Sequence, residues 1–197
     1  MIQHSRSFLF LPLCAVVLLP PLAGQELSLE IEPAQSKVEF TLGATLHTVH
    51  GTFQLKRGSL HFEPASGAAS GELLVDARSG ASGNDTRDRK MHKEILESER
   101  FPDIVFRPDH AAGKLMPQGI SQMQVHGAFA IHGAEHELTT PVEVRVNGSR
   151  YVITARFTVP YLKWGIKNPS TLFLRVDDHV EIALDAVAHL ANPLPSH

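Results

Sequence analysis

The first residues that could carry chemistry are histidines placed beside glycines. The stretch VHGAFAIHG, Val125 to Gly133, contains His126 and His132, each followed by glycine. The tripeptide Val49-His50-Gly51 repeats this His-Gly pair upstream. Imidazoles hold metal ions and transfer protons. If the stretch is a strand, six residues at about 3.3 Å each place its two imidazoles about 20 Å apart, too far for one ion. We interpret them as exposed histidines on the outer side of a strand that ends at a His132-Gly133 turn.

Two closer histidine pairs keep a metal site open as the alternative. His47 and His50 are three residues apart and could meet on a helical turn, while His132 and His136 could meet across a turn. Neither pair brings an obvious third ligand, whereas closed zinc sites use four. We predict no metal site and no resident cofactor. The rival hypothesis is a periplasmic metal-binding or stress-response protein that acts through surface histidines.

The side chains of hydrolytic enzymes are present without the spacing that such enzymes need. Gly80-Ala81-Ser82-Gly83 lacks the Gly-x-Ser-x-Gly pattern of a nucleophile elbow. Arg87-Asp88 and Asp177-Asp178 fit element ends or turns better than acid–base catalysis. The only cysteine, Cys14, lies in the N-terminal apolar segment. We predict no catalytic residue and expect a protein that is not an enzyme.

The N-terminus has the composition of a secretory leader. An apolar run from Phe8 to Leu19 contains Pro12, ends at Pro20-Pro21 and is followed by Ala23-Gly24. These twelve residues are too few to span a bilayer, which takes about 20. We expect a signal peptide over residues 1–24, one domain over residues 25–190 and a C-terminal tail over residues 191–197. The chain would then be periplasmic or secreted, with no stable membrane anchor.

The charge balance argues against nucleic acid as a partner. The formal net charge is −3, and removal of Arg6 with the leader makes it more negative. The densest basic run, Arg87-Asp88-Arg89-Lys90, is diluted by acidic neighbours. A slightly acidic chain without a basic patch lacks the electrostatic footprint of a nucleic-acid-binding protein.

The elements that must position these side chains are strands, because nearly every segment after residue 25 alternates apolar and polar residues. The alternation is clear around residues 27–31, 38–42, 49–55, 60–62, 73–77, 104–106, 123–131, 142–146, 153–159 and 180–186. Asn147-Gly148 is a strong hairpin signal, and a turn is expected at Arg57-Gly58. Residues 84–98 predict one exposed helix capped by Asn84 or Asp85. Short helices or turns are expected at Thr45–Val49 and Tyr161–Thr171.

About eight or nine antiparallel strands, each apolar on one face, predict an all-β domain. A sandwich and a sheet closed into a barrel both satisfy this pattern. In a barrel of about eight strands, the apolar faces point inward and can enclose one small ligand. Six phenylalanines stand at the alternating strand positions that would face inward: Phe40, Phe53, Phe62, Phe106, Phe129 and Phe157. The alternation alone leaves open whether the inside is filled or hollow.

Several short segments of the sequence, in their order and spacing, resemble the YceI-like family of exported polyisoprenoid-binding proteins. SKVEF and VHGTF resemble its opening strands, and VDARSGASGNDTRD resembles its strand, loop and Arg-Asp pair before the helix. FPDIVFRP, VHGAFAIHGAEHELTTPVEV, VPYLKWGI and DDHVEIALDAVA resemble later strands and loops. Two positions depart from the family pattern: Ala44 stands where members often have histidine, and His92 lies further from the Arg-Asp pair.

The resemblance implies a lipocalin-like antiparallel barrel that binds a long isoprenoid lipid, such as a polyprenyl diphosphate or a quinone, for transport or storage. The pore is then expected to be lined by Phe40, Leu42, Phe53, Phe62, Val75, Phe106, Phe129, Ile131, Phe157 and Ile182. Candidates for contact with a polar head group at one mouth are Arg87, Asp88, His92 and Lys163. The oligomeric state stays open, with a homodimer as one alternative.

Overall fold

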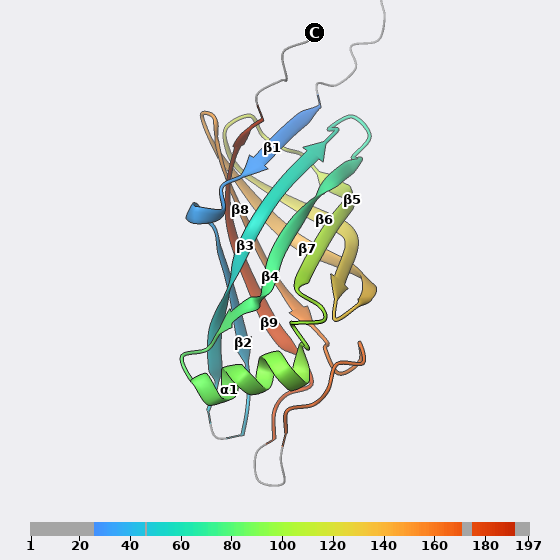
Figure 1. Cartoon of the computed structure of the whole chain (residues 1–197). Coiled ribbons are helices and arrows are strands. Elements are labelled where there is room, and N and C mark those ends of the chain that lie inside the picture. The colour runs from blue at the N-terminus through green and yellow to red at the C-terminus, as the bar shows by residue number, and fades with distance from the viewer. Residues whose placement is uncertain (1–25, 46, 171–174, 192–197) are drawn as a thin grey trace, which may run out of the picture.

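A computed structural model describes residues 26–45, 47–170 and 175–191 and shows an all-β fold (Figure 1). The predicted signal peptide lies outside the described residues, as does the predicted tail apart from Ala191. The strands are β1 (Leu27–Ile31), β2 (Lys37–Leu42), β3 (Val49–Phe62), β4 (Ala69–Ala81), β5 (Asp103–Gly113), β6 (Gly119–Ile131), β7 (Ala134–Asn147), β8 (Arg150–Val159) and β9 (Val180–Leu190).

The sheet closes on itself into an antiparallel barrel, so the barrel alternative is confirmed. The strand order is β1-β3-β2-β9-β8-β7-β6-β5-β4, and pairing of β3 with β4 closes the ring. Eight strands, β2 to β9, form this ring. The ninth strand, β1, also pairs with β3 and β9 and continues the line of β2 toward the end where β9 finishes (Figure 1).

The break between β1 and β2 is a single 3-10 turn, η1 (Pro33–Gln35), that leaves the wall of the barrel hydrogen-bonded. Pro33 lacks the backbone N–H that a strand would use, so the chain leaves the ladder there. The Ser36 hydroxyl donates to the carbonyl of Glu32 at 2.8 Å and accepts from the backbone N–H of Val187 at 3.1 Å. These bonds join the two half-strands to β9.

The expected turn at Arg57-Gly58 is wrong, because β3 runs unbroken from Val49 to Phe62. Its register against β4 shifts between Leu55 and Arg57, which marks a β-bulge. A bulge inserts one residue and reverses which positions face inward. Up to Leu55, the odd-numbered residues of β3 face inward. Beyond the bulge, the even-numbered Leu60 and Phe62 face inward instead. In the sequence, this change looks like the start of a new strand.

Both expected hairpin turns exist. His132 and Gly133 have φ angles of 52° and 77°, the pair of positive values that a type I′ turn requires, and they join β6 to β7. Asn147 pairs with Arg150, so the loop of the second hairpin is Gly148-Ser149, one residue later than the Asn-Gly signal. Gly148 adopts a φ of 60°, which suits the first position of a type II′ turn.

The predicted helix is shorter than expected and has two parts, α1 (Asp85–Lys90) and η2, a π-helix (Met91–Ile95). Asn84 caps it as predicted, since its side chain accepts from the backbone N–H of Arg87 at 3.0 Å. It stops short of residue 98 because Glu97 adopts a left-handed φ of 46°. The described residues from Thr45 to Val49 contain no helix, and Leu46 lies outside them. Tyr161–Gly165 forms the expected turn.

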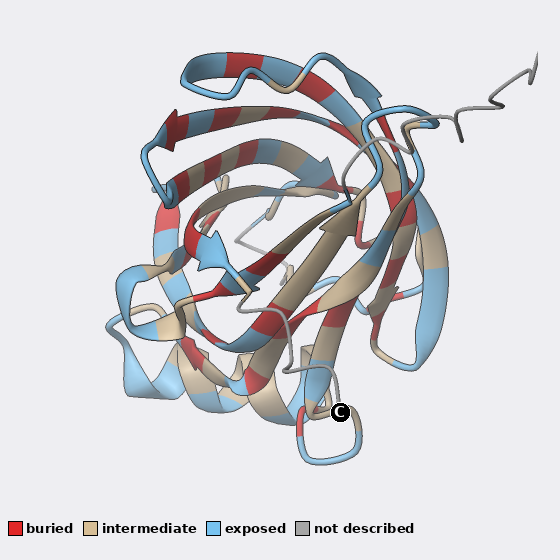
Figure 2. Ribbon diagram, turned by 90° about the horizontal axis from the view of Figure 1, so that it is seen from above, coloured by how far each residue is buried: buried red, intermediate tan, exposed pale blue. Residues whose placement is uncertain are grey.

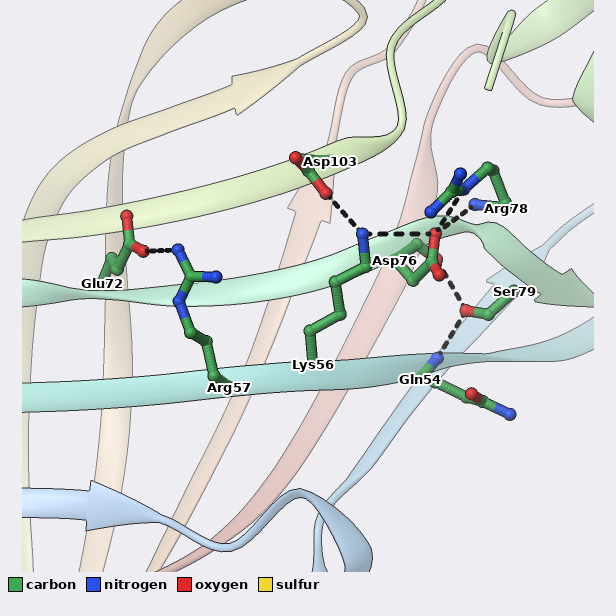
Figure 3. Close-up of polar contacts among 8 residues, drawn as sticks. All are labelled: Gln54, Lys56, Arg57, Glu72, Asp76, Arg78, Ser79 and Asp103. Carbon is green, nitrogen blue, oxygen red and sulfur yellow. Dashed lines mark hydrogen bonds and ion pairs between the residues drawn. The ribbon is translucent and has the colours of Figure 1, made fainter. Parts of the chain in front are cut away.

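Burial alternates along most strands, with buried and exposed bands following one another (Figure 2). The inward side forms the core, and the outward side of β3, β4 and β5 carries ion pairs (Figure 3). Lys56 lies 2.7 Å from Asp103 and 3.7 Å from Asp76, while Arg57 lies 2.7 Å from Glu72. Partial burial opposes ionisation of Asp76, but bonds from Arg78 and the charge of Lys56 outweigh it and lower its pKa. Lys56 and Arg57 of β3 thus meet carboxylates of the neighbouring strand β4, and Lys56 also reaches Asp103 on β5, beyond it.

Candidate ligand-binding cavity

The barrel encloses a cavity of about 600 Å³. Its wall is made by the inward side chains of all nine strands and of the helix. All ten residues predicted to line the pore do line this cavity: Phe40, Leu42, Phe53, Phe62, Val75, Phe106, Phe129, Ile131, Phe157 and Ile182. The interior is therefore hollow, a point that the alternation of residues left open.

Further lining residues follow from the same parity and were not singled out from the sequence. Apolar examples on β7 and β8 are Val142, Val144, Ile153 and Ala155, each less than 9% exposed. Thr140 is one of the few polar side chains in the wall and is 4% exposed. Its hydroxyl donates only to nearby backbone carbonyls, those of Pro141 and Arg156 at 3.2 and 3.5 Å. The wall thus offers a ligand dispersion contacts and very few hydrogen bonds.

The two ends of the cavity differ in polarity. The end beneath the helix, here called the helix mouth, is lined by His47, Ser82, Asn84, Thr86, Arg87 and Lys90. The opposite end, here called the terminal mouth because β1 begins and β9 ends beside it, is bounded by Leu27, Leu60, His61, Phe62 and Leu115. Within the described residues, no aspartate or glutamate lines the cavity, while Arg87 and Lys90 do. The lining of the helix mouth therefore includes two basic side chains and no acidic one.

Arg87 is held at the helix mouth by the loop before the helix. Its Nε donates to the Ser82 hydroxyl at 2.7 Å, and a terminal nitrogen donates to the Ser82 carbonyl at 2.8 Å. Asp88 accepts from the backbone N–H of Ser82 at 3.1 Å and from its hydroxyl. Burial opposes the charge of Asp88, but these bonds and the charge of Arg87 prevail and lower its pKa. Asp88 thus fixes the loop and is not among the residues that line the cavity.

The other two head-group candidates also lie off the cavity wall. The His92 ring is bonded on both sides, with Nε2 2.9 Å from the Gly80 carbonyl and Nδ1 3.1 Å from the Ser98 hydroxyl. These contacts attach the helix to β4. Lys163 is exposed in the turn after β8. Of the four candidates only Arg87 lines the cavity, and Lys90, which the sequence did not single out, joins it there.

Trp164 packs against inward-facing rings at the helix end of the barrel. Its ring stacks on His136 with centroids 4.2 Å apart and planes within 2° of parallel, and it lies 5.7 Å from the ring of Phe129. Phe129 in turn meets Phe157 edge to face at 5.9 Å. Aromatic contacts of this kind add to the energy of simple burial. Trp164 itself is not part of the cavity wall.

Of the two histidine pairs considered for a metal, His47 and His50 lie on opposite sides of the barrel wall. His47 lines the cavity, whereas His50 faces outward, with its Nδ1 3.1 Å from the Thr41 hydroxyl. Within the described residues, one group has the composition and spacing of a metal site, namely Asp109, His126 and Glu137. His126 places Nδ1 2.7 Å from Asp109 and Nε2 3.0 Å from Glu137. The two nitrogens point to opposite carboxylates, which is the arrangement of an imidazolium between two ion pairs.

A closed antiparallel barrel around an apolar cavity defines the class of this protein. The chain belongs to the family of the YceI-like domain, whose model matches residues 29–188, and the predicted membership is confirmed. No curated protein matches the chain. Among the described residues, no helix combines the length and apolarity needed to cross a membrane.

Solved structures share this fold at low sequence identity. BcnA of Burkholderia cenocepacia is 20% identical with a TM-score of 0.66, over 80% of this chain and 98% of that one. A polyisoprenoid binding domain from Saccharophagus degradans, implicated in plant cell wall breakdown, is 13% identical with a TM-score of 0.62, over 84% and 99%. The YceI protein of Campylobacter jejuni is 14% identical with a TM-score of 0.54, over 69% and 81%.

Proposed function

We propose that this protein binds a long-chain isoprenoid lipid non-covalently, for transport or storage, in the periplasm or outside the cell. The observation that carries the proposal is the hollow barrel, whose cavity of about 600 Å³ is walled almost entirely by aliphatic and aromatic side chains. Pockets that bind small molecules are typically concave, mostly apolar and of about 300–1,000 Å³. The polyisoprenoid binding domain with the same fold supports the choice of ligand.

An isoprenoid tail suits this wall because it offers no hydrogen bonds and needs none. Each buried methylene contributes about 0.8 kcal/mol before the cost of ordering the chain. Affinity then grows with the length of tail that the cavity accommodates, without any particular side chain making a directional contact. This explains why the candidate site consists of alternating apolar residues on many strands and not of a compact motif.

The charges at the helix mouth favour an anionic head group over a neutral one. Arg87 and Lys90 line this end of the cavity, and no acidic residue among those described lines it with them. Thr86, Ser82 and Asn84 add polar groups at the same place. A diphosphate would form ion-paired hydrogen bonds there, which are stronger than those that the neutral carbonyls of a quinone would accept. We therefore prefer a polyprenyl phosphate or diphosphate to a quinone.

The most direct test is extraction of the exported protein from its own host, followed by mass spectrometry of the extract. We expect an isoprenoid lipid in a fixed ratio to protein. Protein that carries no lipid and takes up no polyprenyl lipid when offered it would overturn the proposal. The rival metal hypothesis has its own measurement, calorimetric titration with Zn²⁺. Tight binding that disappears in His47→Ala and His50→Ala, in lipid-free protein, would favour the rival.

A further inference from the structure

The exposed apolar side chains of this protein are gathered at one end. In the part of the chain that the structure describes, three large hydrophobic residues are well exposed: Met116 (41%), Ile120 (48%) and Leu190 (44%). Met116 lies in the loop between β5 and β6, Ile120 at the start of β6 and Leu190 at the end of β9. All three elements reach the end of the barrel away from the helix (Figure 1).

Two of these side chains, Met116 and Leu190, continue the lining of the cavity onto the surface, while Ile120, which precedes the buried Ser121, faces the outside of the barrel at the same end. Leu115, which bounds the terminal mouth, directly precedes Met116. Leu190 pairs with Leu29, another lining residue, which in turn pairs with Leu60. Apolar side chains thus reach from the cavity to solvent at the terminal mouth, beside His61, whose ring lies 3.5 Å from Glu26. The helix mouth offers no such apolar connection, because Arg87 and Lys90 would have to lose their hydration there.

We propose that the terminal mouth docks on the surface of a lipid bilayer and holds the barrel where its ligand resides. The inference rests on the proposed function, since only a ligand that resides in membranes makes such docking necessary. A peripheral protein binds a bilayer by inserting apolar side chains to the depth of the acyl boundary. Met116, Ile120 and Leu190 on the rim of the mouth provide such side chains.

The connection of the chain to its apolar leader favours a bilayer as the occupant. The apolar run ends at Leu19, seven residues before Glu26, and β1 begins beside the terminal mouth. Seven residues span at most about 25 Å. Until it is removed, a leader engaged with the membrane therefore holds this mouth close to the bilayer. The helix mouth lies further away by the length of a strand such as β6, whose 13 residues extend about 40 Å.

The first experiment is flotation of the exported protein with phosphatidylcholine vesicles. We expect the wild type to float, and we expect Met116→Glu, Ile120→Glu and Leu190→Glu each to lower the bound fraction about tenfold, because a charge at the acyl boundary is costly. Ala81→Glu, which adds the same charge at an exposed position on the helix side, is expected to float like the wild type. Failure of the wild type to float, or equal flotation of all variants, would overturn the proposal.

The second experiment does not depend on disruptive substitutions. Trp164 is the only tryptophan of the chain and lies at the helix end. Brominated phosphatidylcholine in the vesicles is expected to leave its fluorescence unchanged, and to quench a tryptophan at the mouth in the double variant Ile120→Trp, Trp164→Phe. Quenching of Trp164 in the wild type, or none in the double variant, would overturn the proposal.

Two further readouts separate bilayer docking from association of two copies and from a wrong choice of ligand. Analytical ultracentrifugation tests whether a second copy of the chain covers the terminal mouth. If the mouth variants abolish a dimer but still bind vesicles, bilayer docking is overturned. Lipid content is measured on the same preparations. If the protein carries isoprenoid but does not bind vesicles, the docking proposal is refuted and the proposed ligand is not. Protein that floats through the mouth but carries no isoprenoid supports docking and refutes the proposed ligand.

Discussion

His132 Nε2 lies 3.5 Å from Glu97 Oε1, and in the part of the chain that the structure describes these two are the non-glycine residues with positive φ. Glu97 ends the helix, and His132 opens the β6–β7 turn. Lys167, in the segment after β8, lies 3.5 Å from the same carboxylate oxygen, and Arg100 lies 3.7 Å from the other. The Glu97 carboxylate thus ties three segments together at the helix end, where two residues adopt an unfavourable backbone conformation.

This arrangement predicts a stabilising effect that acid removes. Burial opposes the charge of Glu97, but Lys167 and His132 outweigh it and lower its pKa below the ordinary value of 4.5. A carboxyl whose pKa is lowered in the fold stabilises the protein above its unfolded pKa and loses that effect as pH falls through its folded pKa. We expect Glu97→Gln to reduce the melting temperature above about pH 4.5 and to match the wild type in stronger acid.

Glu99→Gln is the matched control for this prediction. Glu99 is exposed, two residues further along, and has no ion pair among the described residues. We expect its melting temperature to follow that of the wild type at every pH. A Glu97→Gln deficit of the same size in acid and at neutral pH would show that the carboxylate charge is not what holds the three segments.

His126 predicts the opposite dependence on pH. The hydrogen bond to Asp109 raises the His126 pKa above 6.5, slight burial opposes it, and the charges of Asp109 and Glu137 add to the increase. A group whose pKa is raised in the fold stabilises it below the unfolded pKa and loses that effect as pH rises through the folded pKa. We expect His126→Gln to melt below the wild type at pH values under about 6.5, with the difference vanishing in alkaline solution.

His110→Gln controls for loss of an imidazole at the same place. His110 is the partner of His126 across the β5–β6 pair and is exposed. It forms no ion pair among the described residues, so its replacement is expected to change the melting temperature little at any pH. Nuclear magnetic resonance titration of the His126 ring protons measures the pKa directly. A value at or below 6.5 would contradict the prediction.

The alternation of residues predicted the barrel wall well because side-chain direction in a strand has a period of two. All six phenylalanines of inward parity line the cavity, although Phe62 lies on the far side of a bulge. The pattern could not separate that bulge from a turn, since both shift the parity by one residue. It also could not tell a hollow barrel from a filled one, because the volume left inside depends on strand tilt and number.

The polar end of the site was predicted less well, for a different reason. Which side chains of a helix or a loop reach a cavity depends on how that segment packs on the barrel, and no local period encodes this. Arg87 and Lys90 both line the cavity, but the sequence singled out only Arg87. Lys163 was singled out as well, yet it lies exposed in the turn after β8.

The hollow barrel predicts that one inward substitution displaces the ligand while its neighbour does not. Thr139 and Thr140 are adjacent on β7, the first exposed and the second 4% exposed in the cavity wall. Thr140→Trp would place an indole in the cavity and Thr139→Trp would place it in solvent. We expect Thr140→Trp to lose most of its bound isoprenoid and Thr139→Trp to retain it, as measured by lipid extraction and mass spectrometry.

Both of these variants are expected to fold. The cavity of about 600 Å³ leaves room for the indole, so the cost of overpacking should stay within about 1–3 kcal/mol. The lost Thr140 hydroxyl contacts, at 3.2 and 3.5 Å, are long. Melting curves recorded beside the lipid measurement test this. Equal lipid content in two folded variants would show that the ligand does not occupy the barrel.

The basic side chains that line the helix mouth predict that affinity depends on the charge of the head group. In the double variant Arg87→Gln, Lys90→Gln, a diphosphate loses two charge-assisted hydrogen bonds, each worth about 1.5–3 kcal/mol. We expect its affinity for a polyprenyl diphosphate to fall at least tenfold, a change that corresponds to about 1.4 kcal/mol. Affinity for the matching polyprenyl alcohol should change little, because the apolar tail still fills the same wall.

The comparison of the two ligands also separates recognition from folding. Arg87 holds the Ser82 loop through two hydrogen bonds, so its loss could loosen the mouth for any ligand. A loosened mouth would weaken diphosphate and alcohol alike, whereas loss of charge recognition weakens only the diphosphate. Arg89→Gln, Lys93→Gln removes the same two charges from exposed positions on the helix and is expected to bind both ligands like the wild type. Parallel losses for both ligands in the first variant would mean that Arg87 and Lys90 shape the mouth without recognising a head group.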